Sequence, residues 1–267
     1  MDTFYGFLIC SDIDGTLYNS DKVLSEKNRE AIAAYTAAGG LFTIATGRTP
    51  RELTVFDRSI LSAPIIASSG SVLLDHGTGC ILSDEPFKAD GYDILREIWR
   101  EYPEVIGVFS EDNHTEPRLL RENGKPIESI FEAFYAPWHK AILLLRDPSV
   151  RERLELELNT RYGDRYVFDS AWPFSLEMHK GDKGTGVQRL RKMLGKRARV
   201  VICVGDHTND IPMLRVADIG CAVANALSAT RAAADYITPS NDDDAIAFII
   251  AHVLAWEKEK NKLLNER

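Results

Sequence analysis

The sequence predicts an α/β protein whose parallel-sheet core is interrupted by an inserted α+β module. Apolar runs alternate with helix-like stretches near both ends of the 267-residue chain, as is typical of parallel sheets covered by helices. Between about residues 82 and 178 this alternation gives way to a mixture of strands and helices. We therefore expect residues 1–81 and 179–267 to form one core, and residues 82–178 to form an inserted unit.

Apolar runs and the residues that end them place the elements of the first core half. The run at residues 4–10 has the length of a buried parallel strand. Gly39 and Gly40 end the helix-like stretch that precedes them. In order, the sequence predicts a strand at 4–10, a helix at 25–38, a strand at 41–45, a helix opening at Thr49-Pro50 and a strand at 64–68.

The inserted unit and the second core half follow from the same signals. For the inserted unit we expect a helix at 90–101, strands at 105–110 and 141–146, a helix at 149–162, and strands at 166–169 and 175–178. For the second core half we expect helices at 183–194, 209–217 and 228–234, strands at 200–204 and 219–223, and a C-terminal helix from about residue 243. The charged residues 257–267 are interpreted as a solvated tail.

The amino-acid composition of the chain limits the classes of molecule that it is expected to bind. The chain is 45% hydrophobic, and 32 lysines and arginines face 40 aspartates and glutamates, for a net charge of −8. That balance disfavours a nucleic-acid binder, whose affinity comes mainly from a basic surface. Anionic small molecules stay possible, because a bound metal ion reverses the local field of an acidic site.

The cellular setting is predicted from what the sequence does not contain. Its four cysteines form no CxxC or zinc-type spacing, and three of them lie in apolar runs, so buried free thiols are expected. The first residues lack the basic leader of a signal peptide. No apolar run approaches 18 residues, so no membrane span is expected. We expect a cytoplasmic protein, either monomeric or homodimeric.

The segment DIDGTL at residues 12–17 directly follows the first predicted strand. It places Asp12 and Asp14 two residues apart at the carboxyl end of a parallel strand, where open α/β sheets bind their ligands. Gly15 permits a tight turn away from the sheet. An isolated DxDG is an ordinary loop sequence, so the preceding apolar strand is what favours a functional interpretation.

Two further segments supply groups suited to phosphate. Thr46-Gly47-Arg48 ends the second strand, where a threonine hydroxyl and a glycine N–H can donate hydrogen bonds to phosphate oxygens. Lys183 opens the helix after the insertion and offers a compact positive charge, with Lys180 as a competing candidate. Each segment alone is also explained by a simple turn or a surface lysine, and the pattern GxxxxGK[ST] is not satisfied.

The last segment, GDHTND at residues 205–210, ends another predicted strand. Asp206 and Asp210 are four residues apart and can face one point, although Asp210 and Asn209 are also ordinary helix-capping residues. His207 is interpreted as a turn residue. Together with Asp12 and Asp14, these aspartates gather up to four negative charges, which predicts a bound hard cation, and Mg²⁺ suits a site that must also hold phosphate oxygens.

The order DIDGTL, TGR, KG and GDHTNDIPML resembles the haloacid dehalogenase-like (HAD) superfamily, and most closely its Cof-type branch. The resemblance spans the whole chain and implies a Rossmann-like core with a cap inserted between the second and third motifs. Two departures stand out: Ser69-Gly70-Ser71 replaces a frequent Asn-Gly, and Asp242-Asp243-Asp244-Ala245 lacks a frequent glycine. The first departure faces the cap and bears on the choice of substrate.

The resemblance also implies a role for each motif residue. Asp12 would attack phosphorus to form an aspartyl-phosphate, and Asp14 would act as the general acid and base. Mg²⁺ would be held by Asp12, the main-chain carbonyl of Asp14, Asp206 and Asp210. The groups expected to bind the substrate are Ile13, Thr46, Gly47, Lys183 and Asn209.

These observations predict a phosphatase that hydrolyses small phosphate monoesters, such as sugar phosphates. The alternatives are a phosphosugar mutase on the same scaffold, which would have to exclude water from the aspartyl-phosphate, and a catalytically idle phosphate-binding protein. Six cap residues are candidates for substrate contacts, but packing or exposure explains them at least as well: Trp138, Trp172, Phe174, His114, Arg118 and Arg121.

Overall fold

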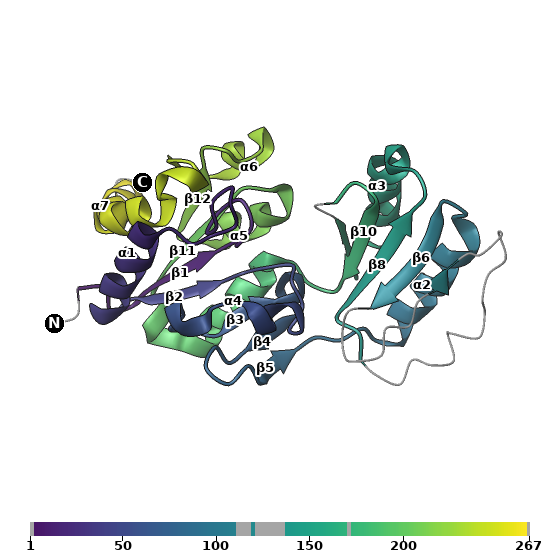
Figure 1. Cartoon of the computed structure of the whole chain (residues 1–267), viewed down its shortest axis with the longest axis horizontal. Helices are drawn as coiled ribbons and strands as arrows, with labels where there is room; N and C mark the ends of the chain where they lie inside the picture. The colour runs from purple at the N-terminus through teal and green to yellow at the C-terminus, as the bar shows by residue number, and fades with distance from the viewer. Residues whose placement is uncertain (1–2, 111–118, 121–136, 170–171, 266–267) are drawn as a thin grey trace.

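The computed structural model describes residues 3–110, 119–120, 137–169 and 172–265. Its centre is a five-stranded parallel sheet in the order β13-β12-β11-β1-β2. The strands span Tyr236–Thr238, Ile219–Val223, Val200–Gly205, Phe7–Ser11 and Leu41–Ile44, in the same order. The α/β fold class and the parallel arrangement of the core are as predicted (Figure 1).

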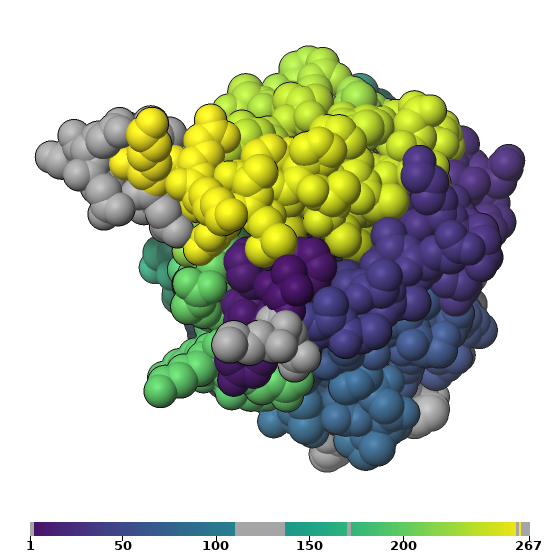
Figure 2. Space-filling model, turned by 90° about the vertical axis from the view of Figure 1, so that its left-hand side faces the viewer, coloured from purple at the N-terminus to yellow at the C-terminus, as the bar shows by residue number. Residues whose placement is uncertain are grey.

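Helices cover both faces of this sheet, and the side chains of β1 alternate between the two layers. Phe7 and Ile9 belong to the core on the side of α1 (Glu26–Ala37) and α7 (Ala245–Asn265), whereas Leu8 and Cys10 pack with residues of α4 (Lys183–Leu194). On the same face as α4 lies α5 (Ile211–Val216), and α6 (Ser228–Ala233) follows β12. Figure 2 shows α7 at the end of the molecule, beside N-terminal segments.

Contacts at the start of α1 join the two ends of the chain. The Ser25 side chain caps α1 by accepting a hydrogen bond from the Asn28 N–H, as expected for a serine at this position. Asn28 is buried and its side chain accepts from the Ala247 N–H in α7. Tyr35 and Ile32 complete the buried face of α1, while Ala31 and Ala38 are only half-buried. The buried face of α1 therefore includes the polar residue Asn28, which the spacing of apolar residues does not indicate.

A small antiparallel sheet extends the core beyond β2. It contains β3 (Ile65–Ala67), β4 (Val72–Leu74) and β5 (Ile81–Asp84), and a parallel bridge between Ala45 and Ile66 attaches it to the main sheet. Only β3 was predicted from the sequence. The helix expected to open at Thr49-Pro50 is instead a short 3-10 turn, Glu52–Val55, followed by a second one at Arg58–Ile60.

The inserted unit has a sheet and a core of its own, and we call it the cap. Its antiparallel sheet has the order β7-β6-β8-β10-β9. In that order the strands are Leu119–Leu120, Val105–Ser110, Lys140–Leu145, Ser175–His179 and Val167–Asp169, with helices α2 (Ala89–Glu101) and α3 (Arg151–Tyr162). Trp99 and Trp138 are buried among its apolar residues.

The chain enters and leaves the cap at neighbouring points. It enters after β5 and returns at the start of α4, and Arg189 of α4 donates a hydrogen bond of 2.6 Å to the Ser83 hydroxyl in β5. The same arginine donates to the main-chain oxygen of Gly70. Among the described residues, no helix is both long enough and apolar enough to cross a membrane.

Candidate functional site

A cleft of about 250 Å³ lies at the carboxyl ends of β1, β2 and β11, where the cap faces the core. The parallel register that pairs Ser11 with Val204 brings the segments after β1 and β11 to one edge of the sheet. Six carboxylates line the cleft, namely Asp12, Asp14, Glu52, Asp169, Glu177 and Asp206. Three cations line it as well, Arg48, Lys140 and Lys183, together with Thr46, Gly47, His207 and Asn209.

Asp12 and Lys183 form the buried centre of the site. Lys183 Nζ donates to Asp12 Oδ1 at 2.6 Å and to Asp210 Oδ1 at 2.5 Å. Burial raises the pKa of Asp12 to about 7, although the Lys183 charge opposes that rise. Burial alone would lower the pKa of Lys183, but the Asp12 and Asp210 charges raise it above its ordinary value. Lys183 therefore stays charged and holds two carboxylates together.

Asp210 is fixed by the main chain of its own segment. Its Oδ2 accepts the N–H groups of Asp206 and His207 at 2.9 and 3.0 Å. A Cβ on Gly205 would lie 2.4 Å from the Asp210 side chain, so only glycine fits at this position. Asp206 is less buried, and its Oδ1 accepts from the Thr16 hydroxyl at 2.9 Å. Burial and the nearby Asp210 charge raise the pKa of Asp206.

Three of the four predicted carboxylates form a set that fits a metal ion. One oxygen from each of Asp12, Asp206 and Asp210 lies within 4.8 Å of the others. Hard cations such as Mg²⁺ prefer oxygen ligands of this kind. The Asp14 side chain is directed elsewhere, because the Arg48 guanidinium binds it through Nη2 at 2.8 and 2.7 Å and through Nε at 3.1 Å. Of the four aspartates predicted to crowd together, three form one cluster, and the fourth, Asp14, forms an ion pair with Arg48.

The phosphate-binding groups expected from the sequence face the cleft, with one exception. Thr46, Gly47, Lys183 and Asn209 all line it. The Thr46 hydroxyl accepts from the Arg48 N–H at 3.1 Å, which leaves its own proton able to point toward a ligand. Ile13 is the exception: its side chain is fully buried in the hydrophobic core and does not line the cleft.

A strained turn after β3 supports the loop that contains Gly47. Ser68 and Ser69 have positive φ angles of 47° and 52°, which L-residues rarely adopt. The Ser69 N–H donates to the Thr46 carbonyl at 3.0 Å and so fixes the peptide group that carries the Gly47 N–H. Gly70 is required here, since a Cβ would lie 2.0 Å from the Asp182 carbonyl oxygen. The turn that departs from the family pattern therefore braces the loop that contains Gly47.

The cap contributes charged residues that sequence reasoning missed. Lys140 is almost fully buried, and its Nζ donates to the Gly47 carbonyl at 3.1 Å and lies 3.5 Å from Glu177. Asp169 also lines the cleft and pairs with His179 at 3.0 Å. These residues come from three cap strands, and no motif in the sequence marks them. Their only signal is charge within otherwise apolar strands, such as Lys140 before the run AILLL.

The other residues that the sequence offered as candidates lie partly in the cleft and partly elsewhere. Arg48 and His207 line the cleft, whereas Lys180 does not. Trp138 is buried in the cap, and Trp172 and Phe174 are exposed away from the cleft lining. The remaining three, His114, Arg118 and Arg121, lie outside the described residues.

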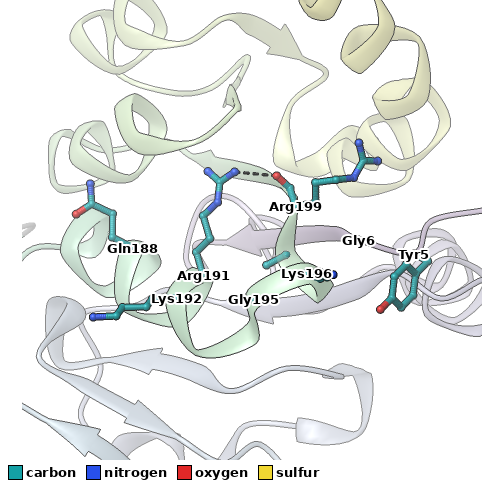
Figure 3. A pocket seen from close by; sticks show the side chains of 9 residues that line it. Tyr5, Gly6, Gln188, Arg191, Lys192, Gly195, Lys196 and Arg199 are labelled. Atoms are coloured by element: carbon teal, nitrogen blue, oxygen red, sulfur yellow. Dashed lines mark hydrogen bonds between the residues drawn. The ribbon is translucent and has the colours of Figure 1, made fainter.

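A larger cavity, of about 800 Å³, lies at the opposite end of the sheet, near the amino ends of β1 and β11 (Figure 3). One of its basic residues, Arg191, already has structural partners. Arg191 donates to the Arg199 carbonyl at 2.7 Å and pairs with Asp218 at 3.0 Å. Size therefore does not identify the functional site here; the grouping of carboxylates and Lys183 at the carboxyl edge does.

Comparison with known proteins identifies the family. The profile of the haloacid dehalogenase-like hydrolases matches residues 9–250, so the chain belongs to this family. The resemblance to its Cof-type branch is confirmed, as is the expectation of an enzyme.

Among curated relatives, a 5-amino-6-(5-phospho-D-ribitylamino)uracil phosphatase of Bacillus subtilis is 27% identical, over 92% of this chain and 94% of its own. A phosphoglycolate phosphatase of Methanopyrus kandleri is 25% identical, over 92% of this chain and 97% of its own.

Solved structures agree on the fold. The phosphatase BT1666 from Bacteroides thetaiotaomicron superposes with a TM-score of 0.79 at 21% identity, covering 94% of this chain and 96% of its own. A haloacid dehalogenase-like hydrolase from the same organism gives 0.74 at 23% identity, covering 92% and 99%. The predicted core with an inserted cap is therefore an arrangement shared with solved members of the family.

Proposed function

We propose that this protein is a magnesium-dependent phosphatase that hydrolyses small phosphate monoesters, such as sugar phosphates, through an aspartyl-phosphate on Asp12. The observation that carries the proposal is the placement of Asp12 against Lys183, beside Asp206 and Asp210, at the carboxyl edge of the sheet. The relatives named as phosphatases support the reaction class. Their different names leave the substrate of this chain to be determined.

Mg²⁺ would be held by the carboxylates of Asp12, Asp206 and Asp210 and by the main-chain carbonyl of Asp14. When bound, the ion would neutralise charge on the phosphoryl oxygens. Lys183, whose Nζ lies 2.6 Å from the Asp12 carboxylate, supplies a second positive charge. The Thr46 hydroxyl, the Gly47 N–H and the Asn209 amide would donate hydrogen bonds to the same oxygens. Positioning and charge neutralisation are the main requirements of phosphoryl transfer.

The reaction would proceed in two displacements at phosphorus. First, an Asp12 carboxylate oxygen bonds to phosphorus while the ester P–O bond breaks, and Asp14 gives its proton to the leaving oxygen. Then Asp14 takes a proton from water, whose oxygen attacks phosphorus and releases Asp12 and inorganic phosphate. We also propose that the cap, which lies between β5 and α4 in the sequence, selects the substrate, and the charged cap residues that line the cleft support this.

The test is phosphate release from a panel of sugar phosphates, nucleotides and an aryl phosphate, with Mg²⁺ and with a chelator. We expect release that requires Mg²⁺ and is lost in Asp12→Asn. Isomerised sugar phosphate without free phosphate would favour a mutase. Binding of phosphate without turnover of any compound would favour an idle binding protein.

A further inference from the structure

Arg48 and Asp14 form an ion pair at the mouth of the cleft. Both carboxylate oxygens of Asp14 are engaged, through three N–H···O contacts of 2.7 to 3.1 Å from one guanidinium group. The side chains are 28% and 46% exposed, so the pair is in contact with water. Ion pairs at such positions contribute little net stability. The contact can therefore be exchanged for another at low cost.

The proposed reaction requires Asp14 to give up this contact. Asp14 must carry a proton toward the leaving oxygen, yet a guanidinium offers only donors and cannot accept an O–H. At least one Asp14 oxygen must therefore turn from Arg48 before the leaving group departs. Arg48 would then stand beside the leaving group with N–H donors released from Asp14, and the guanidinium group suits carboxylate and phosphate oxygens.

Three other charged residues that line the cleft have ionic partners of their own. Lys183 is held by Asp12 and Asp210. The cap carboxylate of Glu177 lies 3.5 Å from Lys140. Asp169 is 3.0 Å from His179. Each of the two cap carboxylates thus has a basic partner within the cap, which reduces its repulsion of an anion near Arg48.

We propose that Arg48 is a specificity-determining residue that exchanges Asp14 for a second anionic group on the leaving-group side of the substrate. The inference rests on the proposed function, in which Asp14 serves the leaving oxygen. It narrows the substrate class to phosphate monoesters whose leaving group carries a carboxylate or a second phosphate a few bonds from the ester oxygen. Arg48 reads that group, while the core motifs hold the transferred phosphoryl group.

The experiment compares kcat/KM within two matched pairs of substrates. The first pair is 2-phosphoglycolate and 2-hydroxyethyl phosphate, which differ by a carboxylate. The second is ethane-1,2-diyl bisphosphate and 2-hydroxyethyl phosphate, which differ by a phosphate. We expect the doubly anionic member of at least one pair to be preferred about tenfold, and the pair that shows the preference identifies the anion.

Variants assign the preference to Arg48. In Arg48→Gln the ratio of kcat/KM values within the pair is expected to fall to about one. Arg48→Lys should keep only part of the preference, because lysine keeps the charge but lacks the planar donors. Arg29→Gln is the matched control: Arg29 pairs with Asp57 at 2.9 Å, is 39% exposed and lies outside the cleft. It should leave the ratio unchanged. A ratio compares two substrates on one variant, so a general loss of activity does not mimic the effect.

Three outcomes would overturn the inference. Equal rates within both pairs would do so while leaving the phosphatase assignment intact. A preference that survives in Arg48→Gln would transfer the role to another residue. A clear preference for the neutral members would indicate that Glu177 and Asp169 read hydroxyl groups instead. Absence of hydrolysis of every substrate, including an aryl phosphate, would overturn the proposed function itself.

Discussion

The ammonium group of Lys183 lies 2.6 Å from the carboxylate of Asp12, although the two residues are 171 positions apart. Lys183 is 2% exposed, so this contact is formed almost entirely out of water. A buried charge is tolerated only where partners compensate it. The carboxyl edge of the sheet and the helix that follows the cap are therefore joined by the Lys183 side chain.

Replacing Lys183 by methionine should destabilise the metal-free protein by about 3–5 kcal/mol, because Asp12 and Asp210 would lose their shared cation. Urea unfolding without Mg²⁺ measures the change in the free energy of unfolding. Lys192→Met on the same helix is the control, since Lys192 is exposed. Equal stability of the two variants would show that Lys183 has no structural part in the site.

Asp12→Asn should lower phosphate release by at least about a thousandfold, since the amide cannot form the phosphoenzyme. Rapid quenching with a labelled substrate should trap phosphate on the wild-type protein and none on the variant. Circular dichroism establishes that the variant is folded. Undiminished turnover would rule out Asp12 as the nucleophile.

Asp206→Asn should weaken Mg²⁺ binding by at least about tenfold, because a neutral amide replaces a charged ligand. Titration calorimetry on the substrate-free protein measures this without reference to activity. Asp164→Asn removes an exposed carboxylate of the cap and should bind Mg²⁺ as the wild type does. An unaltered affinity in Asp206→Asn would move the metal to another ligand set.

The His179–Asp169 pair should make stability depend on pH. Burial alone would lower the pKa of His179, but the Asp169 carboxylate raises it above its ordinary value. For Asp169, burial alone would raise the pKa, but the His179 charge lowers it below its ordinary value. The pair thus stabilises the fold fully between about pH 4 and about pH 6.5. Its contribution is lost as pH rises through the folded-state pKa of His179, or falls through that of Asp169.

His179→Gln should therefore cost about 1–3 kcal/mol near pH 6 and less near pH 9. Urea unfolding at several pH values gives the comparison. His252→Gln, which removes an exposed histidine of α7, should show no such trend. A penalty that is constant from pH 6 to 9 would mean that His179 acts through packing alone.

The sequence predicted much of the core because local signals and topology agree there. The helix at Lys183–Leu194 and the strand at Ile219–Val223 have the predicted bounds. The motifs converge because each follows a parallel strand, and such strands end at one edge. The short strands β4 and β5 were missed, since three or four residues carry too little periodicity for a prediction.

Side-chain pairing was beyond the reach of the sequence. Asp14 and Arg48 each follow a predicted strand, but nothing in the sequence joins their side chains, because that contact depends on the orientation of two flexible groups. Lys140 and Glu177 lie on neighbouring strands of the cap and reach the cleft through packing between distant segments. Ile13 illustrates the converse, since a residue between two site aspartates points into the core.

The hydrogen bond between Arg189 and Ser83 joins the helix that follows the inserted segment to the strand that precedes it. An insertion whose flanking elements are bonded to each other can be exchanged for another without stretching the scaffold that carries it. Grafting a foreign cap between Asp84 and Asp182 would leave the strands that position Asp12 and Asp206 in place. Evolution, and equally a protein engineer, can then vary the substrate and keep the chemistry.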